Sequence, residues 1–306
     1  MNHLCGVISS RTENDDDDEV TAACLASLRE RFESALARIE PSRGSSAATY
    51  ETSYNELPAS GLRPVDDVTL RRFLLADRDH RTNAFNVDAS YTRLIDALKF
   101  RKDYKCDEVV SNLSSNATPE KVRECQRLRV ACWAGVDREA RPVVFERLGQ
   151  FFSSGNATRV EIDDWIVHYL YFLETHFKMM RESSKKVGGK VVSRIVYFAD
   201  FQGVVSSILS RKIWKVVPLL KRLVNTVEQH YPELVDHIVL FNVPRIASAA
   251  FNVVKAFLHP TTSQKIELFA GVPLDRMKEL VPASVIPIEY GGTNSEIDYP
   301  QTETAK

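Results

Sequence analysis

The sequence predicts an α/β fold in which a mostly parallel sheet is covered by helices and preceded by a helical region. After about residue 131, short apolar runs of strand length alternate with longer stretches of helical spacing, which is typical of βαβ units. Before that point, apolar side chains recur at the period of a helix, and no strand pattern is visible. The 306 residues are enough for one core of about 200–250 residues with additional segments.

Residues 1–60 are expected to form a disordered acidic tail that contains one short helix. The acidic run Asp15–Glu19 lies in a polar stretch, and residues 41–61 are rich in Ser, Ala, Pro and Gly. Such segments bury too little apolar surface to form a core. Between them, residues 21–40 carry apolar side chains at helical spacing, which predicts the short helix.

The helical region that follows is expected to span residues 61–131. Asp66 or Asp67 can cap its first helix, because a carboxylate accepts hydrogen bonds from the free amide groups of the first turn. The predicted elements are helices at 66–76 and 88–104, a loop at 111–119 and a short helix to about 131.

Strands and helices alternate in the rest of the chain. The predicted strands are 142–148, 191–200, 236–243 and 265–270, and the predicted helices are 160–182, 204–230 and 246–258. Pro218 is expected to kink or break the second of these helices, because proline lacks the amide hydrogen. The first and third helices are apolar over most of their circumference, which indicates burial on two sides or contact with a cavity.

The sequence carries no pattern that indicates catalysis. It has no GxxxxGK(S/T) loop, no GxGxxG before a helix, no GxSxG and no HExxH, so we expect neither an enzyme nor a cofactor. The five cysteines lack close metal-ligand spacing, so no metal site is expected and the cysteines are interpreted as reduced thiols. A net charge of −1 argues against a nucleic-acid partner.

Neither a secretory signal nor a long apolar stretch is visible, which favours a cytoplasmic protein. Several basic residues on the predicted segment 204–230 suggest a transient contact with anionic membrane surfaces, so the protein is expected to be peripherally membrane-associated. These residues are Arg211, Lys212, Lys215, Lys221 and Arg222. We expect a monomer.

A series of short motifs resembles one known family. The motifs are LRRFLLADRD (70–79), ALKFRKDY (97–104), GVDREARPVVFERLG (135–149), ADFQG (199–203), HYPELVDHIVLFNVP (230–244), VKAFLHPTTSQKI (254–266) and VIPIEYGGT (285–293). In order and spacing they are similar to the CRAL-TRIO lipid-binding domain family, and within it to the phosphatidylinositol-transfer proteins of the fungal secretory type. The resemblance covers residues 66–293.

The resemblance implies an architecture and a function. It implies a helical N-terminal subdomain at 61–131, an α/β/α lipid-binding domain at 132–293 with a mixed sheet as the pocket floor, and a C-terminal tail at 294–306. Residues 246–258 correspond to a mobile gate helix. Such a protein binds one lipid molecule in an apolar pocket and transfers it between membranes or presents it.

The resemblance also implies site residues. Glu233, Thr262 and Lys265 match positions that hold or organise the headgroup in phosphatidylinositol-binding members. Lys265 can neutralise a phosphate, Thr262 can donate a hydroxyl hydrogen bond, and Glu233 can orient Lys265 through an ion pair. The positions expected to line the apolar pocket are Tyr197, Phe251, Val254 and Phe257.

Departures from the family pattern leave the ligand open. Two basic positions of the family are Asp77 and Leu234 here, and two hydroxyl positions used for phosphatidylcholine are Ile195 and Tyr197. The retained residues favour phosphatidylinositol or a related phospholipid. The alternatives are a carrier of an isoprenoid or retinoid-like ligand, and a lipid-sensing regulatory scaffold.

Overall fold

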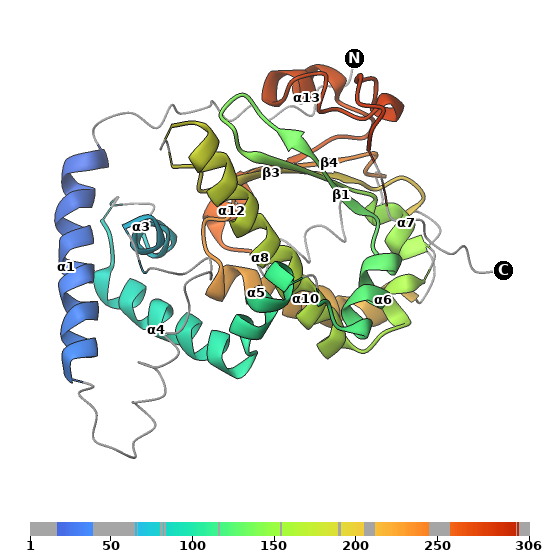
Figure 1. The fold of residues 1–306 in the computed structure, drawn as a ribbon. Helices are drawn as coiled ribbons and strands as arrows, with labels where there is room; N and C mark the ends of the chain where they lie inside the picture. Colours follow the sequence, from blue (N-terminus) through green and yellow to red (C-terminus); the bar gives the residue numbers. More distant parts are fainter. Residues whose placement is uncertain are drawn as a thin grey trace.

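The fold is seen in a computed structural model of the chain (Figure 1). The structure describes residues 17–38, 65, 67–79, 82, 84–115, 117–153, 155–188, 191–204, 212–244, 258–297 and 299. The predicted gate segment 246–258 therefore lies outside the described residues except for Leu258.

Within the described residues, five helices precede the sheet: α1 (Asp17–Arg38), α3 (Asp67–Ala76), α4 (Val87–Asp103), α5 (Cys106–Ser115) and α6 (Glu120–Leu128). The predicted helices at 21–40, 66–76 and 88–104 are confirmed. Helix α1 packs against α3 and α4 through a shared apolar cluster that includes Leu28, Phe73 and Leu94. These helices thus form a small core of their own.

The prediction of a loop at 111–119 is wrong for the first half of that range, because α5 continues to Ser115. The Ser and Asn residues there favour turns, but packing outweighs that preference. Val109 is buried against Tyr171, and the Asn112 side-chain amide donates to the Tyr171 hydroxyl at 2.7 Å.

In the part of the chain that the structure describes, the sheet has five strands in the order β1-β2-β3-β4-β5. They are β1 (Ala131–Val136), β2 (Pro142–Glu146), β3 (Ile195–Asp200), β4 (Val235–Phe241) and β5 (Ile266–Leu268). The pair β1-β2 is antiparallel, and the other three pairs are parallel. The mostly parallel mixed sheet is therefore confirmed, while β1 was not predicted.

Helices cover both faces of the sheet, with α8 (Ile162–Lys186) and α10 (Lys212–His230) on one side and α13 (Leu274–Leu280) on the other (Figure 1). The remaining elements are α7 (Leu148–Ser153), η1 (Asn156–Thr158), α12 (Pro260–Gln264) and η2 (Ile288–Tyr290). A kink or a break was expected at Pro218, and the break does not occur, because helix α10 continues through this residue.

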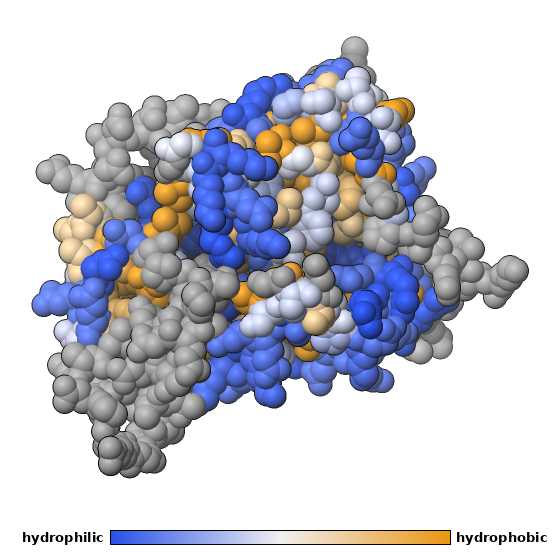
Figure 2. All heavy atoms as spheres, in the orientation of Figure 1, coloured by the Kyte–Doolittle hydropathy of each residue, from blue (hydrophilic) through white to orange (hydrophobic). Residues whose placement is uncertain are grey.

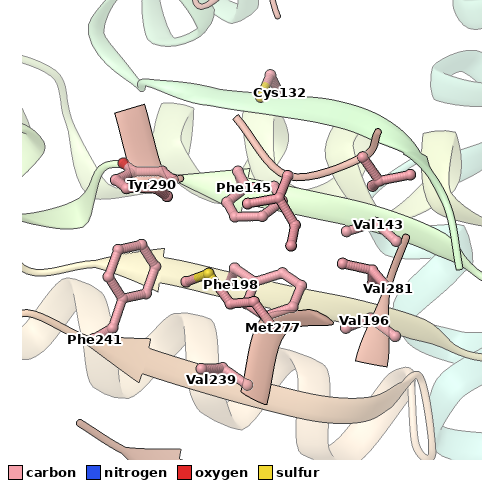
Figure 3. Close-up of a cluster of buried hydrophobic side chains, with 12 residues drawn as sticks. Cys132, Val143, Phe145, Val196, Phe198, Val239, Phe241, Met277, Val281 and Tyr290 are labelled. Carbon is pink, nitrogen blue, oxygen red and sulfur yellow. The ribbon is translucent and has the colours of Figure 1, made fainter. Parts of the chain in front are cut away.

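The face toward α13 is filled with side chains. Phe145 and Phe198 stack there with ring centroids 4.6 Å apart, and they are covered by Met277 of α13 and by Val281, which follows that helix (Figure 3). Because side chains alternate along a strand, the residues between these point to the opposite face. That opposite face carries Val144 and Tyr197 and packs against α8.

Helix α8 is buried on more than one side, as its apolar circumference predicts. Leu170 and Phe177 belong to the cluster beneath the sheet, whereas Trp165 packs with α7 and α10 and Tyr171 packs with α5 and α6. The helix thus joins the helical region to the sheet, and it fixes the side chains beneath the strands.

Candidate functional site

The predicted headgroup residues lie at the edge of the sheet where the parallel strands begin. Arg194 precedes β3, Glu233 lies two residues before β4, and Lys265 precedes β5. Since neighbouring parallel strands begin at the same edge, these three side chains lie close together. We call the group formed by Arg194, Glu233, Asp236 and Lys265 the charged rim.

Glu233 is the centre of the charged rim. Its Oε2 accepts hydrogen bonds from Lys265 Nζ at 2.6 Å and from Arg194 Nη2 at 3.0 Å. Burial alone raises the pKa of Glu233, but Lys265 and Arg194 outweigh it, so the pKa is lowered and the carboxylate is charged. The backbone of Glu233 has φ of +54°, a left-handed conformation that turns the chain into β4.

Thr262 lies one turn away from this pair. It belongs to α12, and its carbonyl accepts a hydrogen bond from the backbone N–H of Lys265 at 3.1 Å. The structure therefore brings Thr262, Lys265 and Glu233 together, and the ion pair expected between Glu233 and Lys265 is present. The side chain of Lys265 is 21% exposed, so part of it is open to solvent at the rim.

Charges continue along the same edge. Asp236 accepts from Arg194 Nη1 at 3.4 Å and is paired with Arg141, which also contacts Asp137 at 2.6 Å. Each cation of the rim thus has at least one acidic partner. A phosphate arriving at the rim would have to share these cations with the acids that now hold them.

The two departures from the family pattern have distinct surroundings. Leu234 is 3% exposed and packs in the apolar cluster with Tyr231 and Phe177. It therefore lies among apolar side chains. Asp77 is paired with Arg93 at 2.7 Å, and its pKa is raised because burial outweighs that partner. Its negative charge is thus partly offset within the protein.

The pocket-lining predictions are only partly within the described chain. Tyr197 lies on the sheet face that packs against α8, and its hydroxyl donates to Glu146. Phe251, Val254 and Phe257 lie outside the described residues. On the side of the molecule that faces the viewer in Figure 2, apolar side chains gather over the strands between α8 and α13. Leu268 of β5 is 41% exposed.

Sequence reasoning missed a polar group beneath the sheet. Arg129 Nε and Nη2 donate to the two oxygens of Glu146 at 2.8 and 2.5 Å. Both side chains are buried, and Tyr197 completes the network. Two features of the sequence could have indicated this polar group. One is the carboxylate at the end of the apolar run PVVFE, and the other is the arginine at the end of the preceding helix. Arg194, within the run VVSRIVYFAD, gave a comparable signal at the rim.

A polar cleft of about 390 Å³ lies at the opposite edge, where β3 and β4 end. Asp200 lines it and accepts from the backbone N–H of Gln202 at 2.8 Å, from Asn242 at 2.8 Å and from the Tyr290 hydroxyl at 2.9 Å. The polar partners of Asp200 come from three separate segments. We interpret this carboxylate as a structural link between the strand ends and the closing EYGG segment.

The basic cluster on the predicted helix 204–230 is only partly described. Arg211 lies outside the described residues, and the side chains of Lys212 and Lys215 are not described. Arg222 donates to the Tyr104 hydroxyl at 2.8 Å and pairs with Asp163 at 2.6 Å, so it links α10 to α4 and α8. Within the described residues, no helix combines the length and apolarity that a membrane span requires.

Comparisons with known proteins agree with this architecture. The chain is 25% identical over 263 residues to the protein "Protein real-time" of Aedes aegypti, covering 84% of this chain and 38% of that protein. It is 26% identical over 248 residues to the "Sec14 cytosolic factor" of Schizosaccharomyces pombe, covering 80% and 81%. The chain thus spans well under half the length of the mosquito relative.

A solved structure shows the same fold. The crystal structure of Sfh5 superposes with a TM-score of 0.64 at 15% identity, over 95% of this chain and 94% of that chain. The family model described as "CRAL/TRIO domain" matches residues 126–292, which is more than half of the chain. The motifs found in the sequence and the match over residues 126–292 together show that the chain belongs to the CRAL/TRIO domain family.

Proposed function

We propose that the chain binds one lipid molecule against the sheet face that carries Tyr197 and transfers it between membranes or presents it. The ligand is phosphatidylinositol or a related phospholipid. The observation that carries this proposal is the charged rim, in which two cations, Arg194 and Lys265, share one oxygen of Glu233. Holding two cations side by side prepares a place for a phosphate.

The rim is suited to an anionic headgroup because Glu233 holds the two cations in position while both remain partly exposed. Lys265 is 21% exposed and Arg194 is 16% exposed, whereas Glu233 is 7% exposed. A phosphate can therefore approach the nitrogen atoms from the solvent side while Glu233 keeps them in position. Thr262 adds a hydroxyl group within one turn of Lys265.

An apolar sheet face next to such a rim matches an amphipathic ligand. Each buried CH₂ group is worth about 0.8 kcal/mol, so acyl chains leave a bilayer only for an apolar enclosure. The partly exposed apolar side chains of β4 and β5, including Ile238 and Leu268, belong to the face opposite α13. We propose residues 246–258 as the gate and residues 132–293 as the lipid-binding domain, preceded by the helical subdomain 61–131.

The cellular setting is proposed on the same grounds. We expect a cytoplasmic, monomeric protein that contacts membranes transiently while it exchanges its ligand. Lys221 is an exposed basic residue on α10 that can contribute to such contact. Membrane binding should then weaken with added salt, because exposed charges are screened.

Lipid extraction and transfer test this proposal together. Mass spectrometry of lipids that co-purify with the chain should recover phosphatidylinositol or a related phospholipid. Transfer of that lipid between vesicles should fall about tenfold or more in Lys265→Ala, because a charge-assisted hydrogen bond to phosphate is worth about 1.5–3 kcal/mol.

Lys278→Ala is the matched control, because Lys278 is an exposed lysine on α13, on the other side of the sheet. It should transfer lipid at the wild-type rate. Recovery of only non-phospholipid ligands, together with unchanged binding by Lys265→Ala, would favour the carrier of an isoprenoid or retinoid-like ligand instead.

A further inference from the structure

The side chains beneath the sheet form a second polar group, separate from the charged rim. Arg129 and Glu146 form a two-point ion pair, and Tyr197 donates to the same carboxylate. The Arg129 guanidinium lies 3.7 Å over the ring centroid of Phe172 on α8. The ion pair cancels its own charge, so this group is close to neutral as a whole.

Two histidines of α8 lie on either side of Phe172. His168, Phe172 and His176 are spaced four residues apart, so they fall on one face of the helix. The ring of His176 packs edge-on against Phe172 at 4.2 Å and against Trp133 of β1 at 5.8 Å. Both histidines are electrostatically coupled to Arg129, which lies over the middle of this face.

These histidines are buried, and their ring nitrogens have no partner within the part of the chain that the structure describes. His168 is 5% exposed and His176 is 1% exposed. Neither ring nitrogen of either side chain has a hydrogen-bond partner there, and the same holds for Arg129 Nη1. Native proteins pair nearly all such buried atoms, because an unpaired one is costly.

The protonation states restrict what could pair with these atoms. Burial, helped by the charge of Arg129, lowers the pKa of His176 to about 3. Burial and Arg129 also lower the pKa of His168 well below its usual value. Both rings are neutral near pH 7, so each offers one N–H donor and one nitrogen acceptor. With Arg129 Nη1, the site offers donors and acceptors but no net charge.

We propose that this interior polar site, formed by Arg129, Glu146, His168, His176 and Tyr197, binds an uncharged oxygen function, a hydroxyl or a carbonyl, at the buried end of a lipid. The inference rests on the lipid binding proposed above and adds a determinant of ligand choice to it. A hydroxyl can accept from Arg129 Nη1 and donate to an imidazole nitrogen. A quaternary ammonium group can do neither, and it would lie beside a guanidinium.

Competition between matched probes tests the site. The purified chain is incubated with an equimolar mixture of 1-hexadecanol and hexadecane and separated from free probe, and both bound compounds are quantified by gas chromatography. The readout is the ratio of bound alcohol to bound alkane. His176→Phe keeps an aromatic ring against Phe172 and Trp133 but removes both nitrogens, and His168→Phe does the same at the other histidine.

The ratio should fall about five- to tenfold in at least one of these variants, as expected for the loss of one neutral hydrogen bond. His230→Phe is the matched control, because His230 stacks on Phe100 at 4.0 Å and lies at the end of α10, away from Arg129. Its ratio should equal that of the wild type.

Four results would overturn the inference. If His176→Phe and His168→Phe both keep the wild-type ratio of bound alcohol to bound alkane, the buried nitrogens do not select the ligand. If hexadecanoate at pH 7.5 is retained better than 1-hexadecanol, and this preference survives His176→Phe, the site takes an anion. If the chain binds no probe and no lipid co-purifies, the proposed function fails as well. Binding of the alkane with no preference for the alcohol refutes the interior site alone.

Discussion

The buried ion pair between Arg101 of α4 and Glu174 of α8 supports the turn that carries Glu233. Arg101 Nη1 donates to Glu174 Oε1 at 2.5 Å, and the Tyr231 hydroxyl donates to the same oxygen at 3.0 Å. The two charged side chains are 3% and 1% exposed. Glu174→Gln keeps the shape of the side chain and removes its charge, so it isolates the contribution of the carboxylate.

The expected effect is large because Arg101 would keep a buried charge without its anion. Arg101 Nε and Nη2 have no partner among the described residues, and the second acceptor of Nη1, the Tyr231 hydroxyl at 3.5 Å, is a neutral group that cannot replace the carboxylate charge. Breaking a buried pair in this way costs about 3–5 kcal/mol. For a domain of this size each kcal/mol lowers the melting temperature by roughly 2–4 °C, which gives a drop of roughly 10 °C.

Urea unfolding followed by circular dichroism measures this difference directly. Glu120→Gln is the control, since Glu120 is a surface carboxylate, 67% exposed, paired with Arg123 and Arg127. It should leave the unfolding midpoint unchanged. A free energy of unfolding for Glu174→Gln within about 1 kcal/mol of the wild-type value would refute the reasoning, because it would mean that solvent or another group replaces the carboxylate.

Further predictions concern pH and packing. The pKa of Glu233 is lower in the folded chain than its usual 4.5. Its ion pairs therefore stabilise the fold above that pH, and this stabilisation is lost as the pH falls through the folded value. The difference in unfolding free energy between wild type and Glu233→Gln should thus shrink below pH 4.5. The pKa of His176 is about 3 in the folded chain and about 6.5 in the unfolded chain. Because the unfolded chain takes up the proton first, the free energy of unfolding falls as the pH drops from 6.5 toward 3. His176→Phe should reduce this acid sensitivity in denaturant titrations across that range. A Cβ on Gly149 would lie 2.0 Å from the carbonyl oxygen of Gln202, so Gly149→Ala should lower the melting temperature strongly, whereas Gly271→Ala, with open space around the added carbon, should not.

The parts of the fold that follow from local pattern could be predicted. The apolar runs of β2, β3, β4 and β5 are flanked by helical stretches, and that alternation is sufficient to indicate parallel pairing. Strand β1 was missed because its pattern is irregular. Its register shifts between Trp133 and Gly135, and of its six residues only Cys132 is fully buried, so no alternation is visible.

The site divides in the same way. Glu233, Thr262 and Lys265 stand in recognisable motifs, so the sequence identified them before their contacts were known. Arg194 could not be assigned to Glu233, because the two are 39 residues apart in the sequence and meet only through the parallel pairing of β3 and β4. Nothing in the spacing of His168 and His176 indicated that Arg129 would lie over the helix face between them.

The charged rim and the interior polar site lie at different depths along the same strand. Arg194 precedes β3 and Tyr197 is three residues further on, so they are about 10 Å apart at the rise of a strand. A phospholipid anchored at the rim and an alcohol anchored in the interior would nevertheless compete, because both place hydrocarbon against the same sheet face. Lys265→Ala should then weaken only the phospholipid, and His176→Phe only the alcohol, while each ligand still displaces the other from the wild-type chain. If both ligands bind at once, or if each substitution weakens both ligands equally, the two polar groups do not serve one shared apolar pocket.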